Sequence, residues 1–179
     1  MHDLSPSLKN KSIFLTGFMG TGKSTIGLAL AQKLNRPFID MDAVLEKKLK
    51  SKIATIFKKK GEAFFRDEET KLLLNLVNNA PAVISTGGGI VLRAQNRALL
   101  KRGLWINLNT SSAIIEKRIE QEHTRPLLPK TKRRQVIETL LNSRRPFYAL
   151  APFQINTDSL AVDAIIHPIL RVLKCHKSK

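Results

Sequence analysis

The residues with the clearest chemistry form a glycine-rich run, GFMGTGKS, at positions 17–24. The run fits the phosphate-binding pattern G-x-x-x-x-G-K-S/T, and it stands between an apolar segment typical of a buried strand and a helical one, as that pattern requires. Glycines let successive backbone N–H groups point at phosphate oxygens, and the positive end of the following helix faces the same anion. Lys23 would reach the β- and γ-phosphates, and the Ser24 hydroxyl would ligate Mg²⁺. The run predicts nucleotide binding but not what happens to the phosphate.

Two carboxylates, Asp40 and Asp42, close the second apolar segment. Their alternate spacing would place both on the same side of an extended chain. Ligands of open parallel sheets sit at the carboxyl ends of the strands. Asp40 would therefore hold Mg²⁺ directly or through water, and Asp42 would orient a substrate hydroxyl for in-line attack. The alternative is that one of the two only caps the next helix.

A second glycine-rich turn, TGGG at positions 86–89, follows the third apolar segment. Three glycines allow backbone N–H groups to approach a ligand closely. No acidic residue stands at the end of this segment, where a P-loop ATPase usually carries a second aspartate on the metal side, so a motor or helicase is disfavoured. The alternative interpretation is a tight turn between a strand and a helix.

Arginines supply the remaining groups that suit an anionic ligand. Arg66 has Glu69 as a partner about one helical turn away. Arg144 and Arg145 are adjacent, and the planar guanidinium of either one suits a carboxylate or a phosphate. Taken singly, each arginine could instead belong to a surface ion pair, which contributes little to stability.

A loop is expected over residues 122–132, EHTRPLLPKTK, because this segment has two prolines, several charges and no amphipathic period. We interpret the loop as a lid. Its Arg125 would stabilise transition-state charge when the lid closes.

Short β-branched apolar runs alternate with longer helical stretches, which favours an α/β fold with a mostly parallel sheet. The stretch from Ala43 to Asn78 reads as an insertion of two or three helices with a break at Gly61. Strands are expected at 12–16, 37–40, 82–85, 104–108 and 153–156, and further helices at 22–34, 92–102, 111–122, 133–141 (extending towards 145) and 161–173.

Length and composition exclude several classes of protein. A chain of 179 residues has the size of one ordinary domain, so we expect a single domain over 1–179. No apolar run approaches the ~18 residues that cross a bilayer, and the N-terminal segment lacks the hydrophobic stretch of a secretory signal, so we expect a cytoplasmic protein without a membrane partner. One cysteine, Cys175, and four scattered histidines exclude a disulfide scaffold and a zinc module.

The charge balance is unusual, because 31 Lys and Arg stand against 14 Asp and Glu, a net charge of +17. Nucleic acid, an acidic membrane surface and small anionic ligands are the possible partners of such a chain. Basic stretches at 47–60 and 125–145 carry much of the excess, but they are not interleaved with aromatic residues, and the chain has one Trp and one Tyr. Stacking platforms for single strands are therefore scarce, and we favour a solvated basic surface.

Six segments in this order resemble the shikimate kinase family of P-loop kinases, and the resemblance spans about residues 12–173. It implies a three-layer α/β/α P-loop kinase fold with a central parallel five-stranded sheet, a helical substrate-binding lobe at about 43–78 and a mobile lid at about 122–132. The six segments are GFMGTGKST (17–25), FIDMD (38–42), IFKKKGEAFFRDEE (56–69), STGGGIV (85–91), RPLL (125–128) and RRPFY (144–148).

The resemblance also implies an activity, the transfer of the γ-phosphate of ATP to the 3-hydroxyl of shikimate with Mg²⁺ as cofactor. By position, Lys23, Asp42 and Arg125 would be catalytic, and Ser24 and Asp40 would serve the metal. Glu69 would position Arg66, and the spacing to Tyr148 favours Arg144 over Arg145 as a carboxylate ligand. The resemblance assigns the nucleotide to Gly20, Thr21, Gly22, Lys23, Ser24, Thr25, Arg118, Arg125 and, less directly, the stretch 156–158; it assigns shikimate to Asp42, Arg66, Gly87, Gly88 and Arg144.

Two other functions remain open at this point. One is a P-loop kinase for another small hydroxy acid such as gluconate. The other, motivated by the basic charge, is a non-enzymatic P-loop protein associated with nucleic acid. The resemblance favours small-molecule partners only, no nucleic acid and a monomer.

Overall fold

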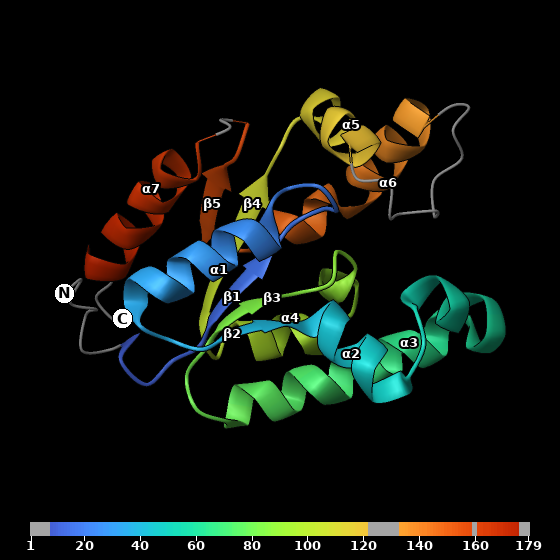
Figure 1. The fold of residues 1–179 in the computed structure, drawn as a ribbon, viewed down its shortest axis with the longest axis horizontal. Helices are drawn as coiled ribbons and strands as arrows, with labels where there is room; N and C mark the ends of the chain where they lie inside the picture. Colours follow the sequence, from blue (N-terminus) through green and yellow to red (C-terminus); the bar gives the residue numbers. More distant parts are fainter. Residues whose placement is uncertain (1–7, 122–132, 159–160, 176–179) are drawn as a thin grey trace.

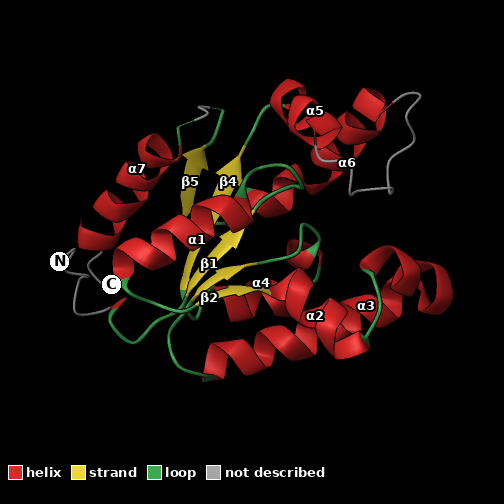
Figure 2. Cartoon of the chain, in the orientation of Figure 1, coloured by secondary structure: helices red, strands yellow, loops and turns green. Residues whose placement is uncertain are grey.

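A five-stranded parallel sheet forms the centre of the computed structural model, which describes residues 8–121, 133–158 and 161–175 (Figures 1 and 2). The strand order is β2-β3-β1-β4-β5, and each neighbouring pair is parallel. The predicted parallel sheet is thereby confirmed. The strands are β1 (Ile13–Thr16), β2 (Phe38–Asp40), β3 (Val83–Ser85), β4 (Leu104–Asn109) and β5 (Phe153–Asn156).

Helices cover both faces of the sheet, as a three-layer fold requires (Figure 1). On one face α1 packs beside α7, and on the other α3, α4 and α6 contribute to a separate apolar cluster. None of the described helices is long and apolar enough to cross a membrane. The helices are α1 (Lys23–Leu34), α2 (Met41–Leu49), α3 (Ile53–Asn78), α4 (Ala94–Leu100), α5 (Ser112–Gln121), α6 (Arg133–Tyr148) and α7 (Val162–Cys175).

The surroundings of β1 explain why its sequence is apolar without interruption. All four of its residues are buried. Alternate side chains enter different clusters, Ile13 and Leu15 towards α1 and α7, and Phe14 towards α3 and α4. A strand covered on both faces needs apolar residues at every position, and this is the pattern of a central parallel strand.

Two helix boundaries differ clearly from the sequence prediction, and the break expected within the helical insertion is confirmed. Gly61 interrupts α3 with φ 81° and ψ 165°, which confirms the expected break. Residues 90–92 form a separate 3₁₀ turn, so α4 begins at Ala94 rather than at 92. Helix α6 continues to Tyr148, beyond the predicted end near 145, and includes Pro146. A proline removes one backbone donor, and the helical bond from the N–H of Ala149 to the carbonyl of Arg145 still forms after it.

We predict that Gly103→Ala destabilises the protein, because Gly103 enters β4 against the neighbouring backbone. A Cβ there would lie 2.5 Å from the carbonyl oxygen of Ser12 and 2.6 Å from Cε2 of the buried Phe14. Backbone cannot move aside as a flexible side chain does, so the free energy of unfolding should fall by about 1–3 kcal/mol. Denaturant unfolding measures it, with Lys101→Ala in the same exposed turn as the control. A midpoint equal to that of the wild type would contradict the packing described.

Candidate active site

The carboxyl ends of β1, β2 and β3 meet at one edge of the sheet, and a cavity of about 370 Å³ opens there. Parallel neighbours end at the same edge, so the segments that follow the three strands share this space. The polar lining comprises Gly20, Thr21, Gly22, Lys23, Ser24, Thr25, Asp40, Asp42, Ser85, Thr86, Gly88 and Arg118. Every P-loop residue predicted to hold phosphate is in this set.

The loop after β1 is shaped for an anion. Gly22, at φ 87°, stands at the N-cap of α1 in a left-handed conformation, and no side chain of the described residues caps the helix. The first N–H groups of α1 are therefore available to a ligand. The ammonium of Lys23 donates to the carbonyls of Gly17 and Phe18, both at 2.9 Å. These bonds hold the cation at the loop where phosphate would bind.

Asp40 joins α1 to α2 with its two carboxylate oxygens. Oδ2 accepts a hydrogen bond from the Ser24 hydroxyl at 2.6 Å, while Oδ1 accepts from the N–H groups of Asp42 and Ala43 and so caps α2. The metal-side role and the capping role that the sequence left as alternatives are thus compatible. Ser24 and Asp40 offer the hard oxygen ligands that Mg²⁺ prefers, and one carboxylate is enough when phosphates complete the shell. Within the described residues there is no cluster of three or more acidic, His or Cys ligands.

The sequence placed Asp42 beside Asp40 by the alternation of side chains along an extended chain, and this argument is wrong. Strand β2 ends at Asp40, and Asp42 lies in the first turn of α2 rather than one strand position further on. It nevertheless lines the cavity, because α2 begins at the sheet edge itself. Its Oδ1 lies 2.9 Å from the place that a Cβ on Gly87 would occupy.

The turn after β3 needs glycine because charged side chains press against its backbone. A Cβ on Gly87 would overlap the carboxylate of Glu69, and one on Gly89 would overlap the guanidinium of Arg66. Neither glycine has a positive φ, so close approach rather than turn geometry accounts for them. The turn therefore serves as a contact surface for α3, and it does more than connect a strand to a helix.

Arg66 and Glu69 form the predicted ion pair, at 2.7 Å, and Glu62 holds the same guanidinium at 3.0 Å. The side chain of Glu69 is completely buried and that of Arg66 is 11% exposed. Burial raises the pKa of Glu69 against the opposing charge of Arg66, and nearby Asp42 adds to the rise. Burial lowers the pKa of Arg66, but its two carboxylate partners outweigh this and leave the pKa raised. Arg66 is therefore a fixed cation against Gly89, in the turn whose Gly88 lines the cavity.

Arg144 and Arg145 are adjacent in the sequence but point to different sides of α6. The Arg144 guanidinium carbon lies 5.6 Å from the centre of the Phe18 ring, and Nη1 lies 3.5 Å from the carbonyl oxygen of Gly88. Arg145 lines a different cavity. Successive residues on a helix point about 100° apart, so one of the pair faces the glycine turn and the other faces away. Arg144 contacts Gly88 and Arg66 contacts Gly89 of the same turn, so Arg144, rather than Arg145, lies near Arg66.

The nucleotide assignments are only partly described by the structure. Arg118 donates to the carbonyls of Gly20 and Thr157, at 3.1 and 2.6 Å, and so lies beside the P-loop, while its assignment to the nucleotide stays a prediction. Arg125 and the predicted lid at 122–132 lie outside the described residues, and their roles stay predictions.

Sequence reasoning missed two residues at this site. Ser85, the last residue of β3, has its Oγ 3.4 Å from that of Ser24. The hydroxyl of Tyr148 donates to the carbonyl of Gly88. The end of a strand is a signal for Ser85, whereas the sequence used Tyr148 only as a spacing mark for Arg144 and gave it no contact of its own.

Tyr148 is the sole tyrosine of the chain, and we predict that its hydroxyl ionises at a higher pH in the folded protein than in the unfolded one. Burial raises its pKa to about 12, against the opposing charge of Arg144. The unfolded value is about 10. Its contribution to stability should therefore be fully present below about pH 10 and lost as the pH rises through the folded pKa.

The ultraviolet absorbance of tyrosinate measures this titration in folded and in urea-unfolded protein. Tyr148→Phe provides the blank. A midpoint near the unfolded value, in protein that circular dichroism shows to be folded, would refute the buried hydrogen bond to Gly88.

Comparison with known proteins places the chain in a family. A sequence model of the family "Shikimate kinase" matches residues 19–174. The shikimate kinase of Pelotomaculum thermopropionicum is 41% identical over 167 residues, covering 93% of this chain and 97% of that protein. The shikimate kinase of Microcystis aeruginosa is 40% identical over 173 residues, covering 94% and 91%.

Solved structures agree with these matches. A shikimate kinase from Acinetobacter baumannii, in complex with shikimate, superposes with a TM-score of 0.88 at 37% identity, covering 95% of this chain and 96% of that one. A gluconokinase from Sinorhizobium meliloti superposes with a TM-score of 0.61 at 17% identity, which shows a shared fold alone. With a family match over most of its length and relatives near 40% identity, the chain belongs to the shikimate kinase family.

Proposed function

We propose that this protein transfers the γ-phosphoryl group of ATP to the 3-hydroxyl of shikimate, releasing ADP and shikimate 3-phosphate. The observation that carries the proposal is an uncapped phosphate-binding helix at the cavity together with a buried, fixed Arg66 that contacts the glycine turn lining the same cavity. A kinase for a small hydroxy acid needs both parts, one for the donor and one for the carboxylate of the acceptor. The relative from Acinetobacter baumannii, whose structure contains shikimate, supports the acceptor.

On the donor side, backbone N–H groups of residues 20–25 hold the phosphates, and Lys23 stabilises the charge of the transferring group. Lys23 already lies within the loop on two carbonyls, so little reorganisation is needed. Ser24 and Asp40 would hold Mg²⁺, which neutralises phosphate charge when bound. Arg118 stands beside the P-loop, where it would flank the base of the nucleotide.

On the acceptor side, Arg66 and Arg144 bind the carboxylate of shikimate from two directions. Glu69 is a positioning residue, because its ion pair fixes the guanidinium of Arg66. Asp42 accepts a hydrogen bond from the attacking hydroxyl and orients it, and backbone groups of Gly87 and Gly88 complete the contact. The hydroxyl oxygen bonds to the γ-phosphorus while its proton passes to the Asp42 carboxylate, and the bond from that phosphorus to the bridging oxygen of ADP breaks.

We also propose how the domain is organised and in what state it works. Residues 43–78, on α2 and α3, form the substrate lobe of one domain, because they carry Arg66 and Glu69 against the glycine turn. We propose a cytoplasmic monomer whose basic surface is solvated and steers anionic substrates.

We expect ADP release from ATP and Mg²⁺ only when shikimate is present. Lys23→Ala should lower kcat by at least about 10²-fold, because it removes the cation that stabilises the transferred charge. A coupled assay of ADP formation measures both, and thermal unfolding of the variant checks that it is folded. ADP release that ignores shikimate, or a preference for gluconate in a panel of hydroxy acids, would overturn the assignment of the acceptor.

Arg66→Lys separates acceptor binding from donor binding. Lysine cannot make the planar fork that Arg66 offers a carboxylate, and a charge-assisted bond is worth about 1.5–3 kcal/mol. KM for shikimate should therefore rise roughly 10- to 100-fold, while KM for ATP stays near that of the wild type. Arg102→Lys, an exposed arginine at the end of α4, is the matched control. If Arg66→Lys left both constants unchanged, Arg66 would not be the carboxylate ligand.

A further inference from the structure

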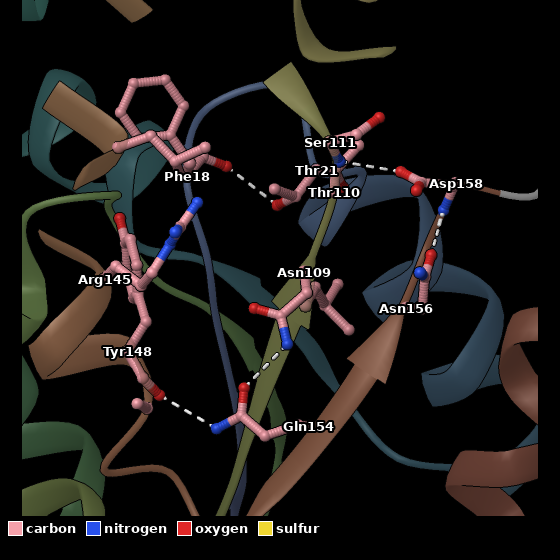
Figure 3. A pocket seen from close by; sticks show the side chains of 13 residues that line it. Phe18, Thr21, Asn109, Thr110, Ser111, Arg145, Tyr148, Gln154, Asn156 and Asp158 are labelled. Atoms are coloured by element: carbon pink, nitrogen blue, oxygen red, sulfur yellow. Dashed lines mark hydrogen bonds between the residues drawn. The ribbon is translucent and has the colours of Figure 1, made fainter. Parts of the chain in front are cut away.

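A second cavity, of about 490 Å³, lies behind the P-loop (Figure 3). It is bounded by the ends of β4 and β5 and by α6, and Phe18 and Thr21 of the P-loop form one wall. Its volume falls within the range of small-molecule sites. Of the described residues, none with a proposed catalytic or shikimate-binding role lines it, whereas Thr21, Asn156 and Asp158 come from the set assigned to the nucleotide.

The floor of this cavity is a set of amide side chains held in fixed orientations. The carboxamide of Gln154 donates to the carbonyls of Tyr148 and Ala151 and accepts from the amides of Asn107 and Asn109. All four of its hydrogen-bonding positions are used, so it cannot turn.

Asn109 is the part of this floor that has capacity left for a ligand. Its oxygen accepts one bond, from Asn107, and its nitrogen donates one, to Gln154. One N–H and one lone pair are therefore unused within the described part of the chain. Figure 3 shows the Asn109 carboxamide among the side chains that line the cavity, bonded to Gln154.

Arg145 supplies a cation on the opposite side. Its guanidinium points into the cavity (Figure 3), and no ion pair joins it to any residue in 8–121, 133–158 or 161–175. Apolar walls stand beside it, formed by Phe18, Leu108 and Leu141. A planar cation beside apolar walls suits a carboxylate attached to a ring.

We propose that this cavity is a second ligand site, for a small aromatic monocarboxylate with a polar ring substituent. Arg145 would bind the carboxylate, the apolar walls would cover the ring, and Asn109 would bond to the substituent. A polyphosphate is a poor match, because Arg145 is the one cation among the described lining residues and Asp158 adds a negative charge at the rim.

The proposed site adjoins the active site, because three of its residues, Thr21, Asn156 and Asp158, belong to the set assigned to the nucleotide. The two cavities share Thr21, which is buried between them. Phe18 lines the second cavity and has Arg144 on its ring, and Tyr148 lines it while its hydroxyl holds the carbonyl of Gly88. A ligand here would contact the residues that position both the arginine and the glycine turn.

The test is a fluorescence titration with 6-hydroxy-2-naphthoate, on protein saturated with ADP, Mg²⁺ and shikimate. Saturation keeps the probe from the carboxylate and nucleotide positions of the active site. We expect saturable one-to-one binding to the wild type, weakened roughly tenfold or more in Arg145→Ala. Arg134→Ala, another exposed arginine of α6, should bind as the wild type does. The neutral 6-hydroxy-2-naphthamide should bind the wild type about as weakly as the naphthoate binds Arg145→Ala.

Ala149→Trp provides a second variant, because it fills the cavity from an exposed position of its wall. It should abolish binding while its thermal unfolding stays cooperative. The proposal is overturned if the wild type does not bind the probe, if ADP and shikimate displace it, or if Arg145→Ala binds it unchanged. The readout is binding, so these results are independent of whether the protein phosphorylates shikimate.

Discussion

The structure depends on the shared register of three parallel strands. Because β2, β3 and β1 are neighbours and run in the same direction, they end together at Asp40, Ser85 and Thr16. The cap of α2, the glycine turn and the P-loop therefore emerge at one edge. Without that register the hydrogen bond between Ser24 and Asp40, which joins the first turns of two helices, would not form.

The second constraint is the contact between α3 and the glycine turn. A buried pair of charges is costly unless its geometry is good, and here Arg66 meets two carboxylates. The bare backbone of Gly87 lets Glu69 approach, and that of Gly89 lets Arg66 approach. The side chain of Glu69 has one oxygen, Oε1, with no hydrogen-bond partner among the described residues. Burial of that oxygen beside Asp42 accounts for the raised pKa of Glu69. The helical insertion is thus joined to the sheet through the very groups that we assign to the acceptor.

Helix α6 contacts both the glycine turn and the cavity behind the P-loop. Arg144 faces the glycine turn across the ring of Phe18, Arg145 faces the cavity behind the P-loop, and Tyr148 reaches both. The polar chain from Trp105 through Thr16 to Asn107 and Asn109 runs through the sheet to the floor of the second cavity. Each group in that chain is bonded, which keeps this wall rigid.

Much of the fold follows from local pattern. Uninterrupted apolar runs identified the strands, the motif at 17–24 identified the phosphate loop, and helical spacing identified the ion pair of Arg66 with Glu69, because each signal lies within a few neighbouring residues. Tertiary packing decided the rest. It placed Asp42 on a helix, pointed Arg144 and Arg145 in different directions, and made Gly87 and Gly89 necessary by pressing charged side chains from α3 against them. Such features depend on contacts between elements that are far apart in the sequence. The residues next to a position along the chain do not specify those contacts.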